Sequence, residues 1–164
     1  MRRRYQVIVA CCVAVLLGAC AQTTALEPQN QPLDTRQARL HFIRNPALIR
    51  QIGSADIKVD GKLVGSLTTG SYLVVDRPPG PHKITVYGSI DPTGFEADIN
   101  VGPGVSYYYE LEPIMRINAD ALNYAGMGVS GKPLPGQSGS NSPFMFYSLE
   151  PTAGAASVAR IRNS

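Results

Sequence analysis

The stretch FEADINVGPGVSYYYELE, residues 95–112, contains two runs in which apolar and polar side chains alternate. Their apolar residues fall at every second position: Phe95, Ala97, Ile99 and Val101 in the first run, and Val105, Tyr107, Tyr109 and Leu111 in the second. A period of two is typical of β-strands that bury one face. The Gly-Pro-Gly sequence between the runs predicts a turn. Residues 95–112 therefore predict two one-sided strands joined by a tight corner.

Six further runs are rich in β-branched and aromatic residues and are separated by Gly, Pro, Asp and Asn, a spacing typical of strands and turns. They are Arg39 to Ile43, Asp56 to Val59, Lys62 to Leu67, Tyr72 to Asp76, His82 to Tyr87 and Phe144 to Leu149. One-sided strands need a second layer, and the sequence offers little helix to form it. We therefore expect an all-β fold, an antiparallel β-sandwich of about seven to eight short strands. A short C-terminal helix is expected over Thr152 to Arg162, with Val158 and Ile161 turned inward.

Two turns have a defined chemistry. Asp60-Gly61 predicts a hairpin, because glycine accepts the positive φ that a tight turn requires. A two-residue loop would pair Ile57 with Val64, and a three-residue bulged loop would pair Ile57 with Leu63. The sequence leaves both registers open. The stretch Arg77 to His82, RPPGPH, predicts a corner, because proline has no backbone donor to continue a ladder.

The N-terminus has the layout of a bacterial export signal. The basic residues Arg2 to Arg4 precede an apolar run, Val7 to Leu17, which is short for a membrane-spanning helix of about 20 residues. The tetrapeptide Leu17-Gly18-Ala19-Cys20 resembles the lipobox that lipoprotein signal peptidase recognises. An ordinary secretory peptide cleaved at Gly18-Ala19 is the alternative.

The lipobox resemblance implies that Cys20 becomes the first residue of the mature protein. Cys20 would then carry a thioether-linked diacylglycerol and an acylated amino group, and we expect no other cofactor. Two or three chains make a stable anchor, whereas one binds reversibly. Ala21 is not aspartate, which in enteric-type sorting implies the outer membrane. We therefore expect a lipid-anchored protein of the bacterial cell envelope that faces the periplasm.

The expected organisation is a signal peptide over 1–19, a lipid anchor and disordered tether over 20–37, and a single β-sandwich domain over 38–164 with a long loop at 114–143. The tether prediction rests on residues 21–37, AQTTALEPQNQPLDTRQ, which are polar and show no period. Cys11 and Cys12 lie in the predicted signal peptide, so Cys20 would be the only cysteine of the mature protein after residues 1–19 are removed. An intramolecular disulfide and a cysteine metal site are thereby excluded.

The charge of the mature part is balanced. Residues 1–19 hold three of the 15 Lys+Arg and none of the 12 Asp+Glu, which leaves 12 basic and 12 acidic residues. A neutral body lacks the basic surface that nucleic acid requires. We therefore expect no nucleic-acid partner.

The stretch Ala55 to Gly88 resembles an uncharacterised family of small bacterial lipoprotein domains that is similar to the PEGA domain. The shared pattern consists of Asp60-Gly61-Lys62, Val64-Gly65, Gly70-Ser71-Tyr72 and Pro79-Gly80-Pro81-His82, with later similarity in Val105 to Pro113 and in the closing SLEP and ARI stretches. The resemblance implies a PEGA-like or immunoglobulin-like sandwich and a lipoprotein, with no catalytic residues to carry over. The segment Ile114 to Pro143 departs from the family as a long insertion.

Catalytic motifs are incomplete. Gly126 to Lys132, GMGVSGK, has the spacing of a phosphate-binding loop, but Pro133 stands where Ser or Thr should bind Mg²⁺. The strand before it and the helix after it are missing from the pattern as well. Neither Ser130 nor Ser138 lies in a nucleophile elbow. We therefore expect no catalytic residue and no nucleotide.

The two histidines and an acidic strand face are the remaining candidates for metal binding. We expect His41 to be solvated, because its neighbours Leu40 and Phe42 point the other way, and His82 to pack or bond within its turn. Glu96 and Asp98 either form a cation site or, as we favour, a solvated strand face. Because neither histidine has companions at metal-ligand spacing, we expect no metal site.

Tyr87 and Tyr108 are predicted to point outward and form a candidate interaction surface for a glycan or a protein. The alternative, which we favour, is that both cover neighbouring strands.

The leading interpretation is a non-enzymatic envelope lipoprotein that binds membrane lipid through Cys20 and serves as a binding or assembly accessory for an envelope protein or glycan. The alternative is an exported hydrolase or small-ligand-binding protein that uses the 114–143 loop. A third hypothesis is an exposed edge strand, Arg39 to Ile43 or Phe144 to Leu149, that adds to a partner's sheet.

Overall fold

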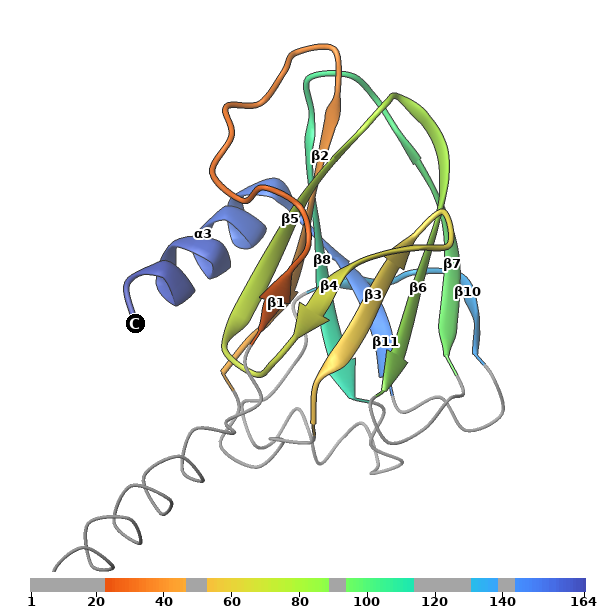
Figure 1. Ribbon diagram of the computed structural model, residues 1–164, viewed down its shortest axis with the longest axis vertical. Helices are drawn as coiled ribbons and strands as arrows, with labels where there is room; N and C mark the ends of the chain where they lie inside the picture. Colours follow the sequence, from red (N-terminus) through yellow and green to blue (C-terminus); the bar gives the residue numbers. More distant parts are fainter. Residues whose placement is uncertain (1–22, 47–52, 89–93, 114–130, 139–143) are drawn as a thin grey trace, which may run out of the picture.

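The computed structural model describes residues 23–46, 53–88, 94–113, 131–138 and 144–164. Within these residues the chain forms a six-stranded sheet packed on a five-stranded sheet, and one helix lies outside the five-stranded sheet (Figure 1). None of the described helices combines the length and the apolar character needed to cross a membrane. The predicted all-β sandwich with a short C-terminal helix is confirmed.

The six-stranded sheet is antiparallel throughout. Its strands, in spatial order, are β1 (Thr24–Ala25), β4 (Lys62–Leu67), β3 (Ala55–Val59), β6 (Gly80–Gly88), β7 (Phe95–Val101) and β10 (Gly136–Ser138). The five-stranded sheet contains β5 (Ser71–Arg77), β2 (Ala38–Arg44), β8 (Ser106–Pro113), β11 (Phe144–Leu149) and β9 (Lys132–Pro133), in that order. One pair in this sheet, β2 with β8, is parallel, and this is a departure from the purely antiparallel expectation.

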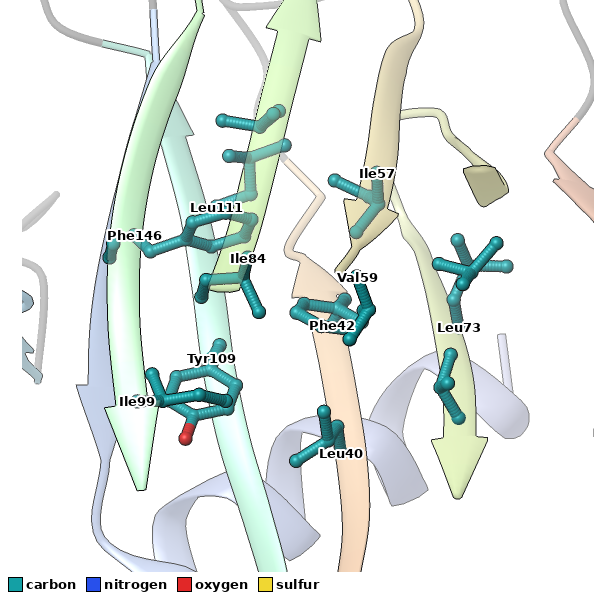
Figure 2. Close-up of a cluster of buried hydrophobic side chains, with 14 of the residues drawn as sticks. Leu40, Phe42, Ile57, Val59, Leu73, Ile84, Ile99, Tyr109, Leu111 and Phe146 are labelled. Carbon is teal, nitrogen blue, oxygen red and sulfur yellow. The ribbon is translucent and has the colours of Figure 1, made fainter. Parts of the chain in front are cut away.

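The core lies between the two sheets (Figure 2). The alternation of β7 holds, because Phe95, Ala97, Ile99 and Val101 are all buried. Tyr109 and Leu111 of β8 are buried with them, whereas Val105 is 43% exposed, since β8 begins only at Ser106. Large side chains from both sheets fill the interior: Leu40, Phe42, Ile57, Val59, Leu73, Ile84 and Phe146.

The corner between β7 and β8 carries the chain from one sheet to the other. β7 belongs to the six-stranded sheet and β8 to the five-stranded sheet. The Gly102 N–H donates to the hydroxyl of Tyr107 at 2.8 Å and holds the start of β8 against this corner.

The β3–β4 hairpin turns at Asp60 and Gly61, which both have positive φ, 52° and 77°. Val59 pairs with Lys62 across this two-residue turn, and a register shift after Ile57 then pairs Ile57 with Gly65. Neither predicted partner of Ile57, Val64 or Leu63, is correct. The bulge inserts one extra residue into β4, and turn chemistry alone does not report it.

Three short strands were not predicted. β1 lies in the segment that we expected to be a disordered tether, and β9 and β10 lie within the expected 114–143 loop. Strands of two or three residues are too short to show a period, and only their pairing partners define them. The rest of that loop, 114–130 and 139–143, lies outside the described residues.

The edge-strand hypothesis needs correction as well. β2 lies between β5 and β8, and β11 lies between β8 and β9, so neither candidate is an edge. Their long-range pairings, with β8 and with β9, decide this position.

The helix α3 (Pro151–Arg162) begins with a proline at its first turn and has Arg160 and Arg162 in its last. Both positions suit a helix, since proline presets φ at the start and cations favour the C-terminal end. Val158 is buried and Ile161 packs beside it against Ile43 and Leu149, as predicted.

Candidate functional site

Residues 23–37 are here called the strap. They run along the side of the sandwich where the chain passes from β4 in the six-stranded sheet to β5 in the five-stranded sheet (Figure 1). Thr24 pairs with Ser66 and Ala25 with Gly65 in β4. The Leu26 N–H then donates to the Val64 carbonyl at 3.0 Å. The expected disordered tether therefore needs correction for residues 23–37, because the strap completes the edge of the six-stranded sheet.

Gln29 binds the edge of the other sheet. Its amide Nε2 donates to the carbonyl of Val74 at 3.0 Å, and the Val74 N–H donates to Gln29 Oε1 at 2.7 Å. Val74 lies in β5, which is the edge of the five-stranded sheet. A side-chain amide thus replaces a neighbouring strand at this point of the edge.

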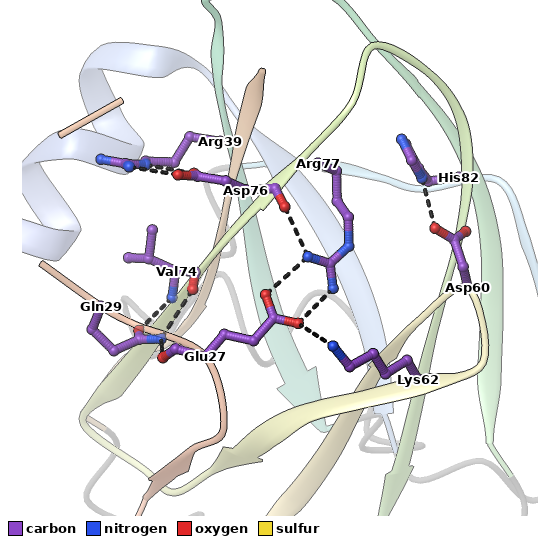
Figure 3. A network of polar contacts seen from close by, with 9 residues as sticks. All are labelled: Glu27, Gln29, Arg39, Asp60, Lys62, Val74, Asp76, Arg77 and His82. Atoms are coloured by element: carbon purple, nitrogen blue, oxygen red, sulfur yellow. Dashed lines mark hydrogen bonds and ion pairs between the residues drawn. The ribbon is translucent and has the colours of Figure 1, made fainter. Parts of the chain in front are cut away.

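Glu27 forms the charged centre of the strap (Figure 3). Both of its carboxylate oxygens accept hydrogen bonds from the Arg77 guanidinium at 2.9 Å. The two side chains are only 17% and 13% exposed, and the more exposed Lys62 Nζ lies 3.5 Å from Glu27 Oε1. The hydrogen bonds from Arg77 lower the pKa of Glu27, although burial opposes the shift.

A second bidentate pair joins β2 to β5. Arg39 donates from Nε and Nη2 to the two oxygens of Asp76, both at 2.7 Å. Hydrogen bonding to Asp76 raises the pKa of Arg39 against the effect of burial. Arg39–Asp76 and Glu27–Arg77 therefore anchor adjacent residues of β5 (Figure 3).

His82 bonds within its turn, as expected. His82 Nδ1 lies 2.7 Å from Asp60 Oδ2, and Nε2 lies 2.8 Å from the carbonyl oxygen of Pro78. The other oxygen of Asp60 accepts from the Lys83 N–H at 2.9 Å. Burial alone would raise the pKa of Asp60, but these donors together lower it.

The strap begins at Thr23, whose hydroxyl bonds to the Thr68 hydroxyl and accepts from the Thr68 N–H at 3.1 Å. Cys20 lies three residues earlier. Cys20 and Leu17, Gly18 and Ala19, the residues of the predicted lipobox, fall outside the described residues.

The structure does not bring Tyr87 and Tyr108 together. Tyr87 lies on β6, where Lys58 Nζ sits 4.8 Å from the centre of its ring. Tyr108 lies on β8 in the other sheet, and α3 packs over it. Both point away from the core, but from different sheets, so they do not form one shared surface; Tyr87 contacts Lys58 and Tyr108 lies under α3.

His41 stacks on Tyr108, with ring centres 4.5 Å apart and planes 16° apart. Its Nδ1 is buried without a hydrogen-bond partner. Burial, aided by the charge of Arg39, lowers the pKa of His41 to about 4. The predicted solvation of His41 was wrong, because the outer face of β2 lies near α3.

Glu96 and Asp98 line the outer face of β7 beside Lys83, whose Nζ is 3.9 Å from Glu96 and 3.0 Å from Asp98. Asp98 is 80% exposed. This arrangement is a solvated, charge-paired strand face. Among the residues that the structure describes, no three His, Cys, Asp or Glu side chains gather as a metal site would require.

The phosphate-loop candidate falls mostly outside the described residues, as does Ser130. Its last residue, Lys132, lies in β9 and pairs with Ser148 of β11. Ser138 is the last residue of β10.

Sequence reasoning missed the contacts of Glu27 and Gln29. Both lie in a polar segment without a period, and their partners Arg77 and Val74 lie 50 and 45 residues away. The residue pattern carries no signal for such pairs.

The model of a family described as "Protein of unknown function (DUF2846)" matches residues 34–123. This range includes β2 to β8 and begins after Glu27 and Gln29. A search of curated proteins found no match.

Proposed function

The chain belongs to DUF2846, a family of proteins of unknown function. We propose that it is a non-enzymatic lipoprotein of the bacterial envelope. It is held to the membrane by acyl chains on Cys20, and its PEGA-like sandwich serves as a binding or assembly module for an envelope protein or glycan. The observation that carries the proposal is the tetrapeptide Leu17-Gly18-Ala19-Cys20 directly after an apolar run.

Two further observations support this function. The mature part has balanced charge, so lipid rather than a basic surface supplies membrane affinity. The strap closes the side of the sandwich that adjoins the anchor, which suits a protein whose N-terminus is held at a surface. Ala21 after the cysteine favours the outer membrane as the site of the anchor.

The test compares the wild-type chain with Cys20→Ser and Cys12→Ser, all expressed with the native signal in a Gram-negative host. We expect wild type and Cys12→Ser to begin at Cys20, to gain the mass of a diacylglycerol and an acyl chain, and to fractionate with membranes. Cys20→Ser should lose both the added mass and the membrane recovery. Cys12→Ser is the matched control, because it removes a cysteine from the same apolar region.

Two extensions address sorting and partners. When inner and outer membranes are separated by density, the wild-type protein should be found in the outer membrane and Ala21→Asp in the inner membrane. Crosslinking in cells should give a discrete partner with wild type. An unmodified, soluble wild-type protein would contradict the proposal and favour the exported hydrolase or ligand-binding alternative.

A further inference from the structure

The strap joins the two ends of the sandwich. It starts at Thr23 beside Thr68, where β4 has ended and β5 is about to begin; we call this the Thr68 end. It finishes at Gln37, whose carbonyl accepts from the Gly104 N–H at 2.8 Å. That corner, at the start of β8, is the Val105 end. Strand β5 alone separates the two ends by about 20 Å, at about 3.3 Å per residue.

A docked and an undocked strap would attach the lipid to opposite ends. With the strap docked, Cys20 is three peptide units from Thr23, so it lies within about 11 Å of the Thr68 end. With the strap free, the first fixed residue is Ala38, which pairs with Arg77 at the Val105 end. The lipid would then be attached to that end through a flexible segment with a mean length of about 20 to 25 Å. The state of the strap therefore sets the end of the sandwich to which a lipid on Cys20 would be attached.

Several independent contacts favour the docked state. The β1 pairing and the paired amide bonds of Gln29 attach the strap to the edges of both sheets. The Glu27–Arg77 pair is charge-assisted and mostly buried, which makes it stronger than an exposed pair. Gly65 also leaves room for the strap, because a Cβ there would lie 2.4 Å from the carbonyl oxygen of Thr24.

We propose that the docked strap fixes the Thr68 end of the sandwich against the lipid bilayer and directs the Val105 end away from it. This inference rests on the proposed lipidation of Cys20. The turn residues 68–71, which adjoin the start of the strap, are Thr, Thr, Gly and Ser and carry no charge. The Asp60 hairpin lies at the opposite end from this turn, because β4 runs from Lys62 next to the hairpin to Leu67 next to the turn. The hairpin is therefore available to a partner in the periplasm.

The test measures the distance of each end from the membrane. Pro46→Cys labels the Thr68 end, since Pro46 is exposed and adjoins Gly70, and Val105→Cys labels the other end. Each lipidated protein is labelled with a bimane fluorophore and reconstituted in phosphatidylcholine vesicles that contain a lipid with a nitroxide headgroup. The lipid on Cys20 leaves the introduced cysteine as the only free thiol. We expect quenching at position 46 to be several-fold stronger than at position 105.

An undocking variant makes the test specific. In the double variant Glu27→Ala with Gln29→Ala, the difference in quenching between positions 46 and 105 should disappear or invert. The reason is that the lipid is then connected to the fold first at Ala38. Gln31→Ala is the matched control, since Gln31 is an exposed amide of the strap, and it should behave as wild type. Circular dichroism shows whether each variant is folded.

Two readouts separate this inference from the proposed function. Intact mass reports lipidation of Cys20 independently of orientation. Hydrogen exchange at the Val74 and Leu26 amides reports strap docking in the unlipidated Cys20→Ser protein as well. Equal quenching at both labels, or stronger quenching at 105, in a protein whose Cys20 carries lipid would overturn the inference. Rapid exchange at Val74 would also overturn it, whatever the state of Cys20.

Discussion

His41 points away from the core, yet its Nδ1 is buried without a partner where the ring stacks on Tyr108. The charged groups that act on it are Arg39 on its own strand, Asp76 on β5 and Arg162 on α3. Burial dominates and favours the neutral imidazole. This residue therefore links the stability of the fold to pH.

The first prediction concerns this link. The folded pKa of His41 is about 4, below its ordinary value of 6.5, so the unfolded chain takes up a proton first as pH falls. Stability is complete above pH 6.5 and should fall by up to about 3 kcal/mol as pH drops toward 4. Urea unfolding of wild type and His41→Phe at pH 7 and pH 4.5 measures the effect. Phenylalanine keeps a ring for the stack and cannot titrate, so the variant should lose less stability over this range. Equal losses in both proteins would contradict the role of His41.

At the scale of elements, the packing of α3 depends on a residue that is usually unfavourable in a helix. Gly154 is buried at the contact with β8. A Cβ at this position would lie 2.2 Å from Cγ of Tyr108, so the helix backbone rests directly on the ring. Glycine at this position lowers the helix propensity but allows the helix backbone to approach the Tyr108 ring closely.

The second prediction tests this contact. Alanine in place of an exposed helical glycine stabilises by about 1 kcal/mol, but Gly154→Ala should instead destabilise by about 1–3 kcal/mol through overpacking. The control Ala155→Gly, at an exposed position of the same helix, should cost about 1 kcal/mol from propensity alone. Denaturant unfolding gives both values. A higher midpoint for Gly154→Ala would show that α3 does not rest on Tyr108.

At the scale of the whole molecule, the strap protects two sheet edges. β1 covers β4, and Gln29 satisfies both backbone groups of Val74 on β5. Unpaired edges are templates for association with other chains. The strap is therefore part of the folded domain as well as the connection to Cys20.

The third prediction follows from these edges. A chain of residues 34–164 lacks β1, Glu27 and Gln29, whereas a chain of residues 23–164 retains them. We expect the shorter chain to be less stable by roughly 2–4 kcal/mol, since several partly buried hydrogen bonds and one mostly buried ion pair are lost. It should also self-associate through the uncovered β4 edge. Urea unfolding and light scattering of the two chains measure both effects. Equal midpoints and two monomers would show that the strap is dispensable for the fold.

Much of the sandwich was predictable because it is encoded locally. The alternation of Phe95 to Val101 identifies the buried face of β7 without knowledge of its neighbours. Asp60-Gly61 identifies a tight turn because its positive φ values depend on those two residues alone. The hypothesis that Cys20 carries lipid likewise rests on adjacent residues. The bulge at Ile57 was not predictable, because it depends on how β3 and β4 pair.

By itself, the sequence determined the all-β class, eight of the strands and the C-terminal helix, since each depends on residues close together in the chain. The prediction of a lipobox at Leu17 to Cys20 likewise rests on adjacent residues. Only the tertiary structure decided the parallel pairing of β2 with β8, the burial of His41 and the placement of Tyr87 and Tyr108 in different sheets. It also decided that the polar strap docks through Glu27 and Gln29. These features depend on contacts between residues tens of positions apart. The alternation of apolar residues in a strand indicates which face is buried, but it does not indicate which segment covers that face.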